Sequence, residues 1–414
     1  MPAGCDEFDP NALTVEQARA RILEALPRLH GEEWLALRSA LGRVLAHAVH
    51  SPVDVPAYAN SAMDGYAVRA EDLGHPPVRL TLAGTAAAGH PYAGTVQSGQ
   101  CVRIMTGAKL PDGADAVVMQ EHVQREGEFV TMAHSVPAGE NVRAAGGDVA
   151  RGAEVLGRGH TLRPADLGLI ASLGIGEVAV RRRPRVAFFS TGDELRQIGQ
   201  TLADGQIYDS NRYTLHGMLQ RVGVDLLDMG VVRDTPQAVE AAFAAAREVA
   251  DVVITTGGVS VGDADYVKDT LARLGKVDFW KIAMKPGRPL AFGLLSEDTA
   301  FFGLPGNPVS AMATFYQFVQ PALKRLAGAA DALPLTLRAV CVEPLRKTPG
   351  RVDFQRGILG RDGDGRLTVR STGPQGSHVL HSMTLADCFI VLPREWGNVA
   401  AGTEVEVQPF AALI

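Results

Sequence analysis

The segment from Asp251 to Tyr266 limits the fold more strongly than any other part of the sequence. An apolar run at Asp251–Ile254 leads into the glycine-rich stretch Thr255–Gly262, and the acidic residues Asp263 and Asp265 follow. A strand, a glycine turn and a helix in this order form a phosphate-facing edge in α/β proteins. The glycines let the backbone approach a ligand, and the helix N-terminus attracts its negative charge. The acidic residues can then hold a metal ion against the phosphates.

Strand and helix patterns alternate around this segment, from residue 186 to residue 326, and predict a doubly wound sheet. The expected strands are Val186–Ser190, Val224–Val232, Asp251–Thr255, Leu290–Leu295 and Ala300–Leu304. The expected helices are Asn211–Val222, Pro236–Ala250, Ala264–Leu274 and Pro308–Leu326. Ligands bind such sheets at the carboxyl ends of the strands, so the loops after these strands are the candidate site.

The flanking regions predict further domains, so the expected fold class is α/β plus β in a multi-domain chain. Residues 14–26 predict a helix with a capping box from Thr14 and Gln17, and residues 33–50 predict a partly helical segment. Short apolar runs with frequent Gly and Pro predict a β-rich module between residues 51 and 150. A short helix is expected at Pro164–Leu173, and the runs after Pro334 predict a small C-terminal barrel or sandwich.

Composition excludes several classes of protein. The 414 residues suffice for two to four domains, and the net charge of −6 argues against general nucleic-acid binding. The four cysteines form no C-x-x-C pair, which favours a reduced, cytoplasmic chain without zinc. The acidic N-terminus is not typical of a signal peptide, and the absence of a long apolar run predicts no membrane span.

Candidate site residues follow the strands of the α/β region. Thr191 and Gly192 suit phosphate contact, and Glu194 follows them in the same loop. Asp234 precedes a helix, where capping alone can explain it. Together with Asp263 and Asp265 at the same sheet edge, it is also a candidate Mg²⁺ ligand.

A basic, extended segment runs from Trp280 to Pro289. Period-two alternation on one strand places Lys281 and Lys285 on the same face, ~13 Å apart, where they can grip separated anionic groups. Pro286 and Gly287 then turn the chain and present Arg288, although a solvated strand face is the alternative. The run Arg181–Arg185 likewise predicts either a solvated strand end or an anion-binding segment.

Other polar turns leave the same choice open. Asn307 is expected to cap the helix that starts at Pro308, and that helix start can also cradle an anion. In the β module, Asn60–Tyr66, Met105–Asp115 and Asn141–Asp148 are polar turns that are either structural or functional.

Seven motifs follow one another along the chain: Ser61–Val68 (SAMDGYAV), Ile104–Gly107 with Pro111–Gln120, Ser190–Leu195 (STGDEL), Ile207–Arg212 (IYDSNR), Gly257–Tyr266 (GGVSVGDADY), Lys285–Pro289 (KPGRP) and Gly303–Ala311 (GLPGNPVSA). In this order, and over nearly the whole chain, they resemble the molybdopterin molybdenumtransferase family. That family inserts molybdenum at the end of molybdenum cofactor biosynthesis and is related to the C-terminal domain of gephyrin.

The resemblance implies four domains. Residues 1–50 and 151–183 would form an elongated, discontinuous dimerisation domain, and residues 51–150 a β-rich module that completes the partner's active site. Residues 184–330 would form the molybdopterin-binding α/β domain, and residues 331–414 a C-terminal β-barrel.

The resemblance also implies residue roles. The polar positions of the β module that face the cleft are matched by Asp64, Thr106, Arg143 and Asp148. The acidic set of the α/β domain is matched by Glu194, Asp234 and Asp265, and its anion-binding lysines by Lys281 and Lys285. A molybdate pocket shared with the C-terminal domain is matched by Lys285, Arg288, Arg351 and Ser377. The remaining expected substrate-binding residues are Thr191, Gly192, Asn211, Gly257, Gly258, Ser260, Gly306 and Asn307. Three positions depart from the family pattern: Gly147 replaces a usual Glu, Thr256 a usual Ser and Arg288 a frequent Lys.

The implied function is insertion of molybdenum from molybdate into adenylylated molybdopterin, with Mg²⁺ as cofactor and AMP as the second product. The implied assembly is a homodimer with transient contacts to the pathway's adenylyltransferase and to acceptor molybdoenzymes, without nucleic acid or membrane. Two alternatives remain. One is a molybdopterin adenylyltransferase, against which the extra domains argue, and the other is a non-catalytic dimeric scaffold.

Overall fold

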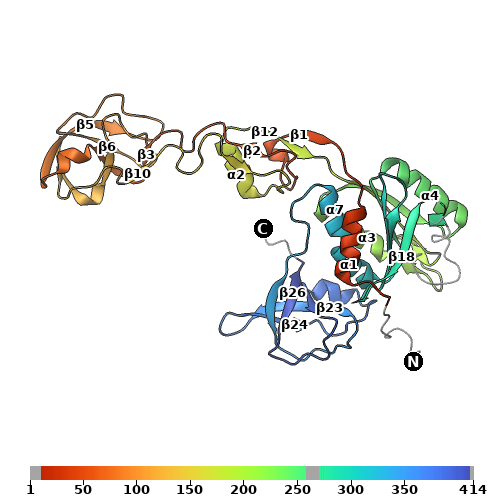
Figure 1. Ribbon diagram of the computed structural model, residues 1–414. Helices are drawn as coiled ribbons and strands as arrows, with labels where there is room; N and C mark the ends of the chain where they lie inside the picture. Colours follow the sequence, from red (N-terminus) through yellow and green to blue (C-terminus); the bar gives the residue numbers. More distant parts are fainter. Residues whose placement is uncertain (1–10, 258–269, 272, 274, 411–414) are drawn as a thin grey trace.

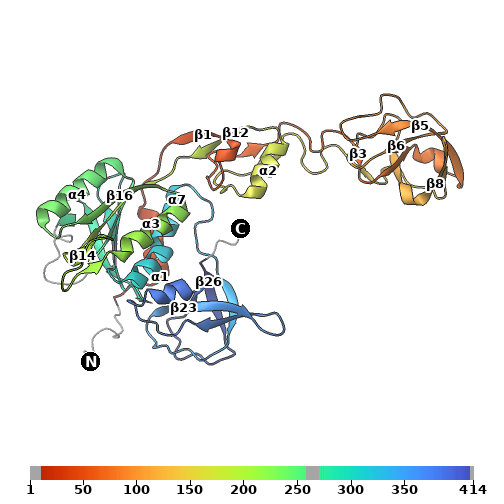
Figure 2. The ribbon, with the colours of Figure 1, turned by 180° about the vertical axis from the view of Figure 1, so that it is seen from behind.

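The computed structural model describes residues 11–257, 270, 271, 273 and 275–410, and it has an elongated shape (Figure 1). The β module lies at one end of the molecule, and the α/β domain and the C-terminal barrel lie together at the other. A narrow connecting region, here called the arm, joins the two ends, and the chain passes through it twice. The view from behind shows the same separation (Figure 2).

The α/β domain is built on a six-stranded sheet with the order β16-β13-β17-β21-β20-β18. The first four strands are parallel: β16 (Asp225–Val232), β13 (Arg185–Thr191), β17 (Val252–Thr256) and β21 (Ala300–Leu304). The last two, β20 (Pro289–Leu294) and β18 (Lys276–Lys281), run antiparallel to their neighbours. All five expected strands are present, and β18 is an additional one.

Helices cover both faces of this sheet, which confirms the doubly wound prediction. Neighbouring residues of β13 point to opposite sides: Phe188 packs in the cluster with α3 (Ser210–Val222), and Phe189 packs in the cluster with α4 (Pro236–Val249). The predicted helix Ala264–Leu274 lies mostly outside the described residues.

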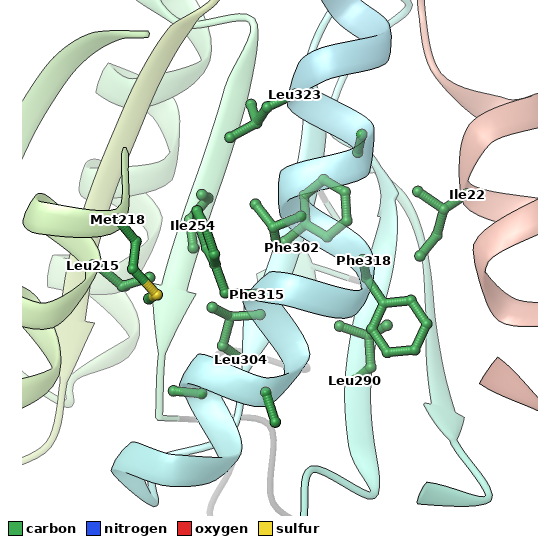
Figure 3. Close-up of a cluster of buried hydrophobic side chains, with 14 of the residues drawn as sticks. Ile22, Leu215, Met218, Ile254, Leu290, Phe302, Leu304, Phe315, Phe318 and Leu323 are labelled. Atoms are coloured by element: carbon green, nitrogen blue, oxygen red, sulfur yellow. The ribbon is translucent and has the colours of Figure 1, made fainter. Parts of the chain in front are cut away.

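The helix predicted at Pro308–Leu326 is continuous, with α6 (Pro308–Thr314), a π-helical turn at Phe315–Val319 and α7 (Gln320–Leu326). Figure 3 shows Phe315, Phe318 and Leu323 of this helix among the strand residues Ile254 and Phe302.

Helix α1 (Val15–Ala25) has the predicted capping box, in which Thr14 and Gln17 exchange hydrogen bonds of 2.9 and 3.1 Å. Its buried side chains, Val15, Ala18 and Ile22, join the α/β core. Figure 3 shows Ile22 in this cluster. This helix therefore packs on the α/β domain, although it falls within residues 1–50, which were expected in the discontinuous domain.

The arm consists of two antiparallel strand pairs and one helix. Strand β1 (Glu32–Ala36) pairs with β12 (Glu177–Arg181), and β2 (Val49–His50) pairs with β11 (Glu154–Leu156), beside α2 (Pro164–Ser172). The prediction of a partly helical segment at 33–50 was therefore largely wrong, since only the turn Leu37–Ser39 is helical. In β1 alternate residues are exposed, and β12 supplies the backbone hydrogen bonds.

The β module holds one six-stranded sheet, with the order β7-β4-β6-β5-β9-β8, and a separate two-stranded pair. The sheet strands are β4 (Gly65–Val68), β5 (Val78–Ala86), β6 (Gln100–Ile104), β7 (Ala116–Met119), β8 (Val123–Glu126) and β9 (Phe129–Met132). The pair is β3 (Asn60–Ser61) with β10 (Val142–Arg143).

The C-terminal domain is a closed five-stranded barrel, as predicted. Its strands follow the order β23-β24-β22-β26-β25, and β25 pairs back with β23 to close the ring. They are β22 (Leu337–Cys341), β23 (Val352–Arg361), β24 (Leu367–Ser371), β25 (Cys388–Leu392) and β26 (Glu404–Pro409), with the short helix α8 (His381–Leu385) beside them. Strand β19 (Met284–Lys285), from the α/β segment, adds to the edge of β23.

Candidate functional site

Three loops meet at the carboxyl edge of the parallel strands. Gly257 follows β17 with a φ of +85°, and a Cβ at this position would lie 2.6 Å from the carbonyl oxygen of Thr191, at the end of β13. A Cβ on Gly306, after β21, would lie 3.9 Å from the Cα of Gly257. The backbones approach so closely that residue 257 must be glycine. The remaining loop residues singled out from the sequence, Gly258, Ser260, Asp263 and Asp265, lie outside the described residues.

Carboxylates gather beside this edge. The backbone of Gly192 has a φ of +152°, and a Cβ there would lie 2.7 Å from the carboxylate of Glu194, which therefore folds back over the glycine. Burial raises the pKa of the half-buried Asp234, and the charges of Asp193 and Glu194 raise it further. Glu194 and Asp234, which the resemblance placed in one acidic set, are thus near enough for the charge of Glu194 to act on Asp234. Within the described ranges, no group of three or more acidic, histidine or cysteine side chains is already arranged around a metal position.

Buried acceptor atoms without hydrogen-bond partners lie near the same edge. Asn211 donates from Nδ2 to the carbonyl of Gly306 at 2.7 Å, but its Oδ1 is buried and unpartnered. Asp209 caps α3 by accepting from the N–H of Arg212 at 3.1 Å, while its Oδ2 is unpartnered, as is Oγ1 of Thr255. Because buried polar atoms normally have partners, the oxygens of Asn211 and Asp209 point to a ligand that donates hydrogen bonds. Thr255 faces the other side of the sheet, together with its register partner Phe189. Asp209 lies in the motif Ile207–Arg212 but was not among the expected site residues.

Asn307 occupies the expected N-cap position of α6, with Pro308 at the first helical position, but its side chain makes no capping hydrogen bond. The prediction of Asn307 as the N-cap residue is therefore confirmed, but the prediction that its side chain caps the helix is wrong. The exposed amide of Asn307 is left at the sheet edge, beside Gly306.

The two lysines predicted on one strand face lie in two different sheets. Lys281 ends β18 and pairs with Pro289, at the same sheet edge as the end of β21. Lys285 belongs to β19 and pairs with Asp353 of the barrel. The prediction of one continuous strand was wrong, because the chain leaves the sheet at Ile282, which donates to the carbonyl of Arg288 at 2.7 Å. The turn at Pro286 and Gly287 therefore brings Arg288 back beside Ile282, where the chain leaves the α/β sheet.

Lys285, Arg351 and Lys347 form a basic cluster on the barrel. The sequence indicated Lys285 and Arg351 but not Lys347. The largely buried Lys347 donates from Nζ to the carbonyls of Arg351 (2.8 Å) and Thr348 (3.2 Å). Burial lowers the pKa of Lys347, Asp353 opposes that shift, and Arg351 and Lys285 add to it. Burial raises the pKa of Asp353. No sequence motif marks Lys347, and only closure of the barrel brings it next to Lys285.

A fully buried arginine holds the loop that carries Ser377. Arg356 of β23 donates to Oγ of Ser382 at 3.0 Å and to the carbonyl of Gly376 at 3.1 Å. Burial lowers the pKa of Arg356 to about 10. The carbonyl of Ser377 accepts from the N–H of Val309 at 3.1 Å, so this barrel loop rests on the first turn of α6. Arg356 was also missed, since it lies inside an ordinary strand pattern.

The polar turns of the β module converge around Ser61. Its N–H donates to the carbonyl of Ala108 at 3.0 Å, and its own carbonyl accepts from Gly107 at 2.8 Å. Arg143 is the register partner of Asn60 in the β3–β10 pair. Thr106 donates to the carboxylate of Asp64 from both its N–H and its hydroxyl. Asp64, Thr106 and Arg143 are therefore exposed on one group of connected turns.

Asp148 lies next to a different part of the module. Its N–H donates to the carbonyl of Val55 at 3.0 Å, where the chain leaves for the arm, and its side chain is exposed.

Further polar residues surround Asp64 that the sequence did not indicate. Arg103 donates to the carbonyl of Gly65 at 2.8 Å and to the side chain of Gln120. Hydrogen bonds from its own backbone N–H and from Gln120 hold the pKa of Glu121 below its usual range. These residues come from β6 and from the turn after β7, and only sheet pairing brings them to Asp64.

Within one chain the two groups of candidate residues are far apart. The turns around Asp64 belong to the β module at one end of the molecule, whereas Glu194, Asp234 and the basic cluster belong to the opposite end (Figures 1 and 2). One chain alone therefore does not join them.

Comparison with known proteins relates all three regions to one family. Residues 13–174 match the MoeA N-terminal region (domain I and II), residues 187–325 a probable molybdopterin binding domain, and residues 338–410 the MoeA C-terminal region (domain IV). None of the helices in the described residues is long and apolar enough to cross a membrane.

Relatives match along nearly the whole chain. The molybdopterin molybdenumtransferase of Haemophilus influenzae is 46% identical over 97% of this chain and 100% of its own length, and that of Nostoc sp. is 41% identical over 93% and 91%. The crystal structure of the molybdopterin biosynthesis moeA protein from Pyrococcus horikoshii OT3 superimposes with a TM-score of 0.84, at 29% identity, over 96% of this chain and 100% of that one. The chain is thus an enzyme of molybdenum cofactor biosynthesis and belongs to the molybdopterin molybdenumtransferase family.

Proposed function

We propose that the enzyme transfers molybdenum from molybdate into adenylylated molybdopterin and releases AMP with the finished cofactor. The observation that carries the proposal is the contact between Ser377 and Val309. Through it, the barrel with its basic cluster is held against the sheet edge at which the glycine turn and the carboxylates lie. A site of this kind offers separate surfaces to a phosphate-bearing pterin and to a tetrahedral oxyanion.

The sheet edge suits the adenylylated pterin. Backbone N–H groups of a glycine turn favour phosphate oxygens. The buried acceptors of Asn211 and Asp209 lack donors, and a pterin ring carries amino and ring N–H groups that can supply them. Thr191, Gly192, Gly257, Gly306 and Asn307 surround this position and complete the proposed substrate contacts. Gly258 and Ser260 are proposed from their sequence positions alone.

The acidic residues fit a hard divalent cation. The pKa of Asp234 is raised partly by neighbouring carboxylates, and a bound cation relieves that repulsion. Carboxylate oxygens are the ligands that Mg²⁺ prefers, usually together with waters and substrate phosphates. Asp234 would hold Mg²⁺, with Glu194 beside it and Asp265 as the further ligand that its sequence position suggests. When bound, the ion would neutralise pyrophosphate charge.

The basic residues are assigned to the anions. Lys281, at the edge of the α/β sheet, would bind the pyrophosphate. Lys285, Arg288, Arg351 and Ser377 would bind molybdate. Fixed positive charges next to the phosphoanhydride stabilise the charge that develops as its P–O bond breaks and AMP leaves. Binding of both substrates at one edge would supply the remaining rate enhancement through positioning.

The β module would complete this site in a homodimer. Asp64, Thr106, Arg143 and Asp148 would act on the substrate bound by the partner chain, since the arm holds them away from their own α/β domain. The arm also exposes apolar surface suited to such a dimer. Trp34 is 70% exposed, and an apolar hollow is lined by Leu37, Leu167, Ala171 and Ile175. Transient contacts with the pathway's adenylyltransferase and with acceptor molybdoenzymes belong to the same proposal.

The decisive experiment measures AMP released from adenylylated molybdopterin by the purified protein, with and without molybdate and Mg²⁺. We expect release that requires both ions, together with formation of molybdenum cofactor. ATP consumption with molybdopterin would instead identify an adenylyltransferase. Binding of the substrate without any AMP release under saturating ions would leave only a scaffold and would overturn the proposal.

A further inference from the structure

Arg182 lies where both passes of the chain enter the arm from the α/β domain. The incoming pass contains His30, shortly before β1, and the outgoing pass contains Arg182, directly after β12. Arg182 donates from Nε to the carbonyl of His30 at 2.6 Å. It thus connects the two passes of the chain at the base of the arm.

The same guanidinium also binds the α/β sheet. Its Nη1 and Nη2 donate to the two carboxylate oxygens of Asp251 at 2.8 and 2.7 Å. Asp251 immediately precedes β17, and it accepts from the N–H of Arg185 at 2.7 Å. Its carbonyl accepts from Ala300 at the start of β21. Two-pronged arginine–carboxylate pairs fix orientation as well as distance.

This geometry explains the arginine run that the sequence left open. Arg182 neither extends into solvent nor binds an external anion, because its two terminal nitrogens donate to the carboxylate of Asp251. Its side chain is 25% exposed and that of Asp251 is 16% exposed, so water competes weakly for the pair. The hydrogen bonds to Asp251 raise the pKa of Arg182 further.

A second contact supports the arm elsewhere. The carbonyl of Gly159, on the arm, accepts from the N–H of Ala330 at 2.9 Å, just after α7. The side chain of Arg181 packs over Gly328, where a Cβ would approach its Cγ to 3.3 Å. A single contact would allow the arm to rotate about it, whereas two separated contacts fix the direction of the arm relative to the α/β domain. The Arg182 contact is the one with charge and two-pronged geometry.

We propose that Arg182 is a positioning residue that fixes the angle between the arm and the α/β domain and thereby directs each β module to the partner's site. The proposal rests on the shared site described under Proposed function. It assigns no contact with substrate to Arg182. Its consequence is that catalysis depends on a residue distant from both groups of candidate site residues.

The test measures the arm angle and the activity separately. Cysteines introduced as Glu154→Cys on the arm and Gln237→Cys on α4, with Cys5→Ser, carry spin labels in the full-length protein. The labelled chain is diluted with unlabelled chain, so that pulsed dipolar spectroscopy reports distances within one chain. We expect a narrow distance distribution for the parent protein, a broad one for Arg182→Leu and an intermediate one for Arg182→Lys, which keeps the charge but loses the fork.

The activity readout then connects the angle to the reaction. In Arg182→Leu we expect turnover to fall roughly ten- to a hundred-fold, because small errors in placement are costly, with unchanged binding of adenylylated molybdopterin. Arg338→Leu is the matched control. It removes another ion pair at 2.7 Å, between Arg338 and Glu404 on the barrel surface, and should alter neither readout.

An unchanged distance distribution in Arg182→Leu would overturn the proposal, and so would a broad distribution with full turnover. If the parent protein releases no AMP, the proposed function fails, whereas the distance measurement still decides whether Arg182 sets the angle.

Discussion

The carboxylate of Asp64 accepts two hydrogen bonds from Thr106, one from the backbone N–H and one from the hydroxyl, each 2.7 Å long. These bonds, with a smaller contribution from the charge of Arg103, hold the pKa of Asp64 below its usual range. Asp64 is exposed, so the arrangement keeps an ionised, oriented carboxylate on the surface of the module. An oriented surface carboxylate suits a site that is completed by another chain.

The first prediction follows from this pair. Thr106→Val retains the backbone donor and removes the hydroxyl, so the pKa of Asp64 should rise toward its ordinary value. Because the pKa of Asp64 is lowered in the folded state, its contribution to stability is present above the unfolded-state pKa and disappears as the pH falls through the folded-state pKa. Carboxyl ¹³C NMR of the two proteins measures the shift. Thr131→Val, on β9 of the same module, is the control, and an identical Asp64 titration in Thr106→Val would contradict the prediction.

Asp234 leads to the second prediction, with the opposite sign. Burial, together with Asp193 and Glu194, raises its pKa, so its favourable contribution to stability is present below the ordinary aspartate pKa and is lost as the pH rises through the raised value. Asp234→Asn should therefore raise the Tm of the metal-free protein at neutral pH. It should also abolish the increase in Tm that Mg²⁺ produces in the parent protein.

Thermal unfolding with and without Mg²⁺, from acidic to neutral pH, tests both parts. Asp364→Asn, in the exposed turn between β23 and β24, should leave both unchanged. A full Mg²⁺-induced shift in Asp234→Asn would remove this residue from the proposed metal site.

The third prediction separates the two lysines. Lys285 lies with Arg351 and Lys347 on the barrel, and Lys281 ends a strand of the α/β sheet. Lys285→Ala should weaken molybdate binding roughly ten- to a hundred-fold, as expected for loss of a charge-assisted contact, and Lys281→Ala should weaken adenylylated molybdopterin binding to a similar extent. Isothermal titration with each substrate makes the comparison. Equal effects of both variants on both substrates would show that the two sheets do not divide the anions between them.

Local signals predicted much of the fold. The capping box of α1 and the strand Ala300–Leu304 could be located from the sequence with the bounds that the structure shows. The segment at 33–50 failed because its strand character depends on pairing with β12, far along the chain. Local periodicity cannot report such a partner.

In the candidate site, too, residues set by local sequence could be predicted, and residues placed by distant contacts could not. Gly257 could be predicted because its turn requires glycine, and only the resemblance placed Glu194 and Asp234 in one acidic set. Lys347 and Arg356 could not be predicted, because closure of the barrel alone brings them beside Lys285 and Ser377. The separation of the two lysines into different sheets depends on β23, which lies beyond the reach of any local pattern.

The last prediction decides whether the site is shared between chains. Asp64→Ala alters the β module, Asp234→Asn alters the α/β domain, and each variant alone should be inactive. In a shared architecture a mixed dimer contains one site with both changes and one site with neither, so mixing the two under subunit exchange should restore activity. AMP release measures the recovery, and native mass spectrometry counts the mixed dimers. As a matched control, Asp234→Asn is mixed with Lys285→Ala at a molybdate concentration too low for Lys285→Ala alone to turn over. Both changes then lie at the same end of the molecule, and the mixture should restore nothing. If mixed dimers form and the first mixture also stays inactive, the β module does not serve its partner, because no arrangement of two shared sites leaves both of them defective.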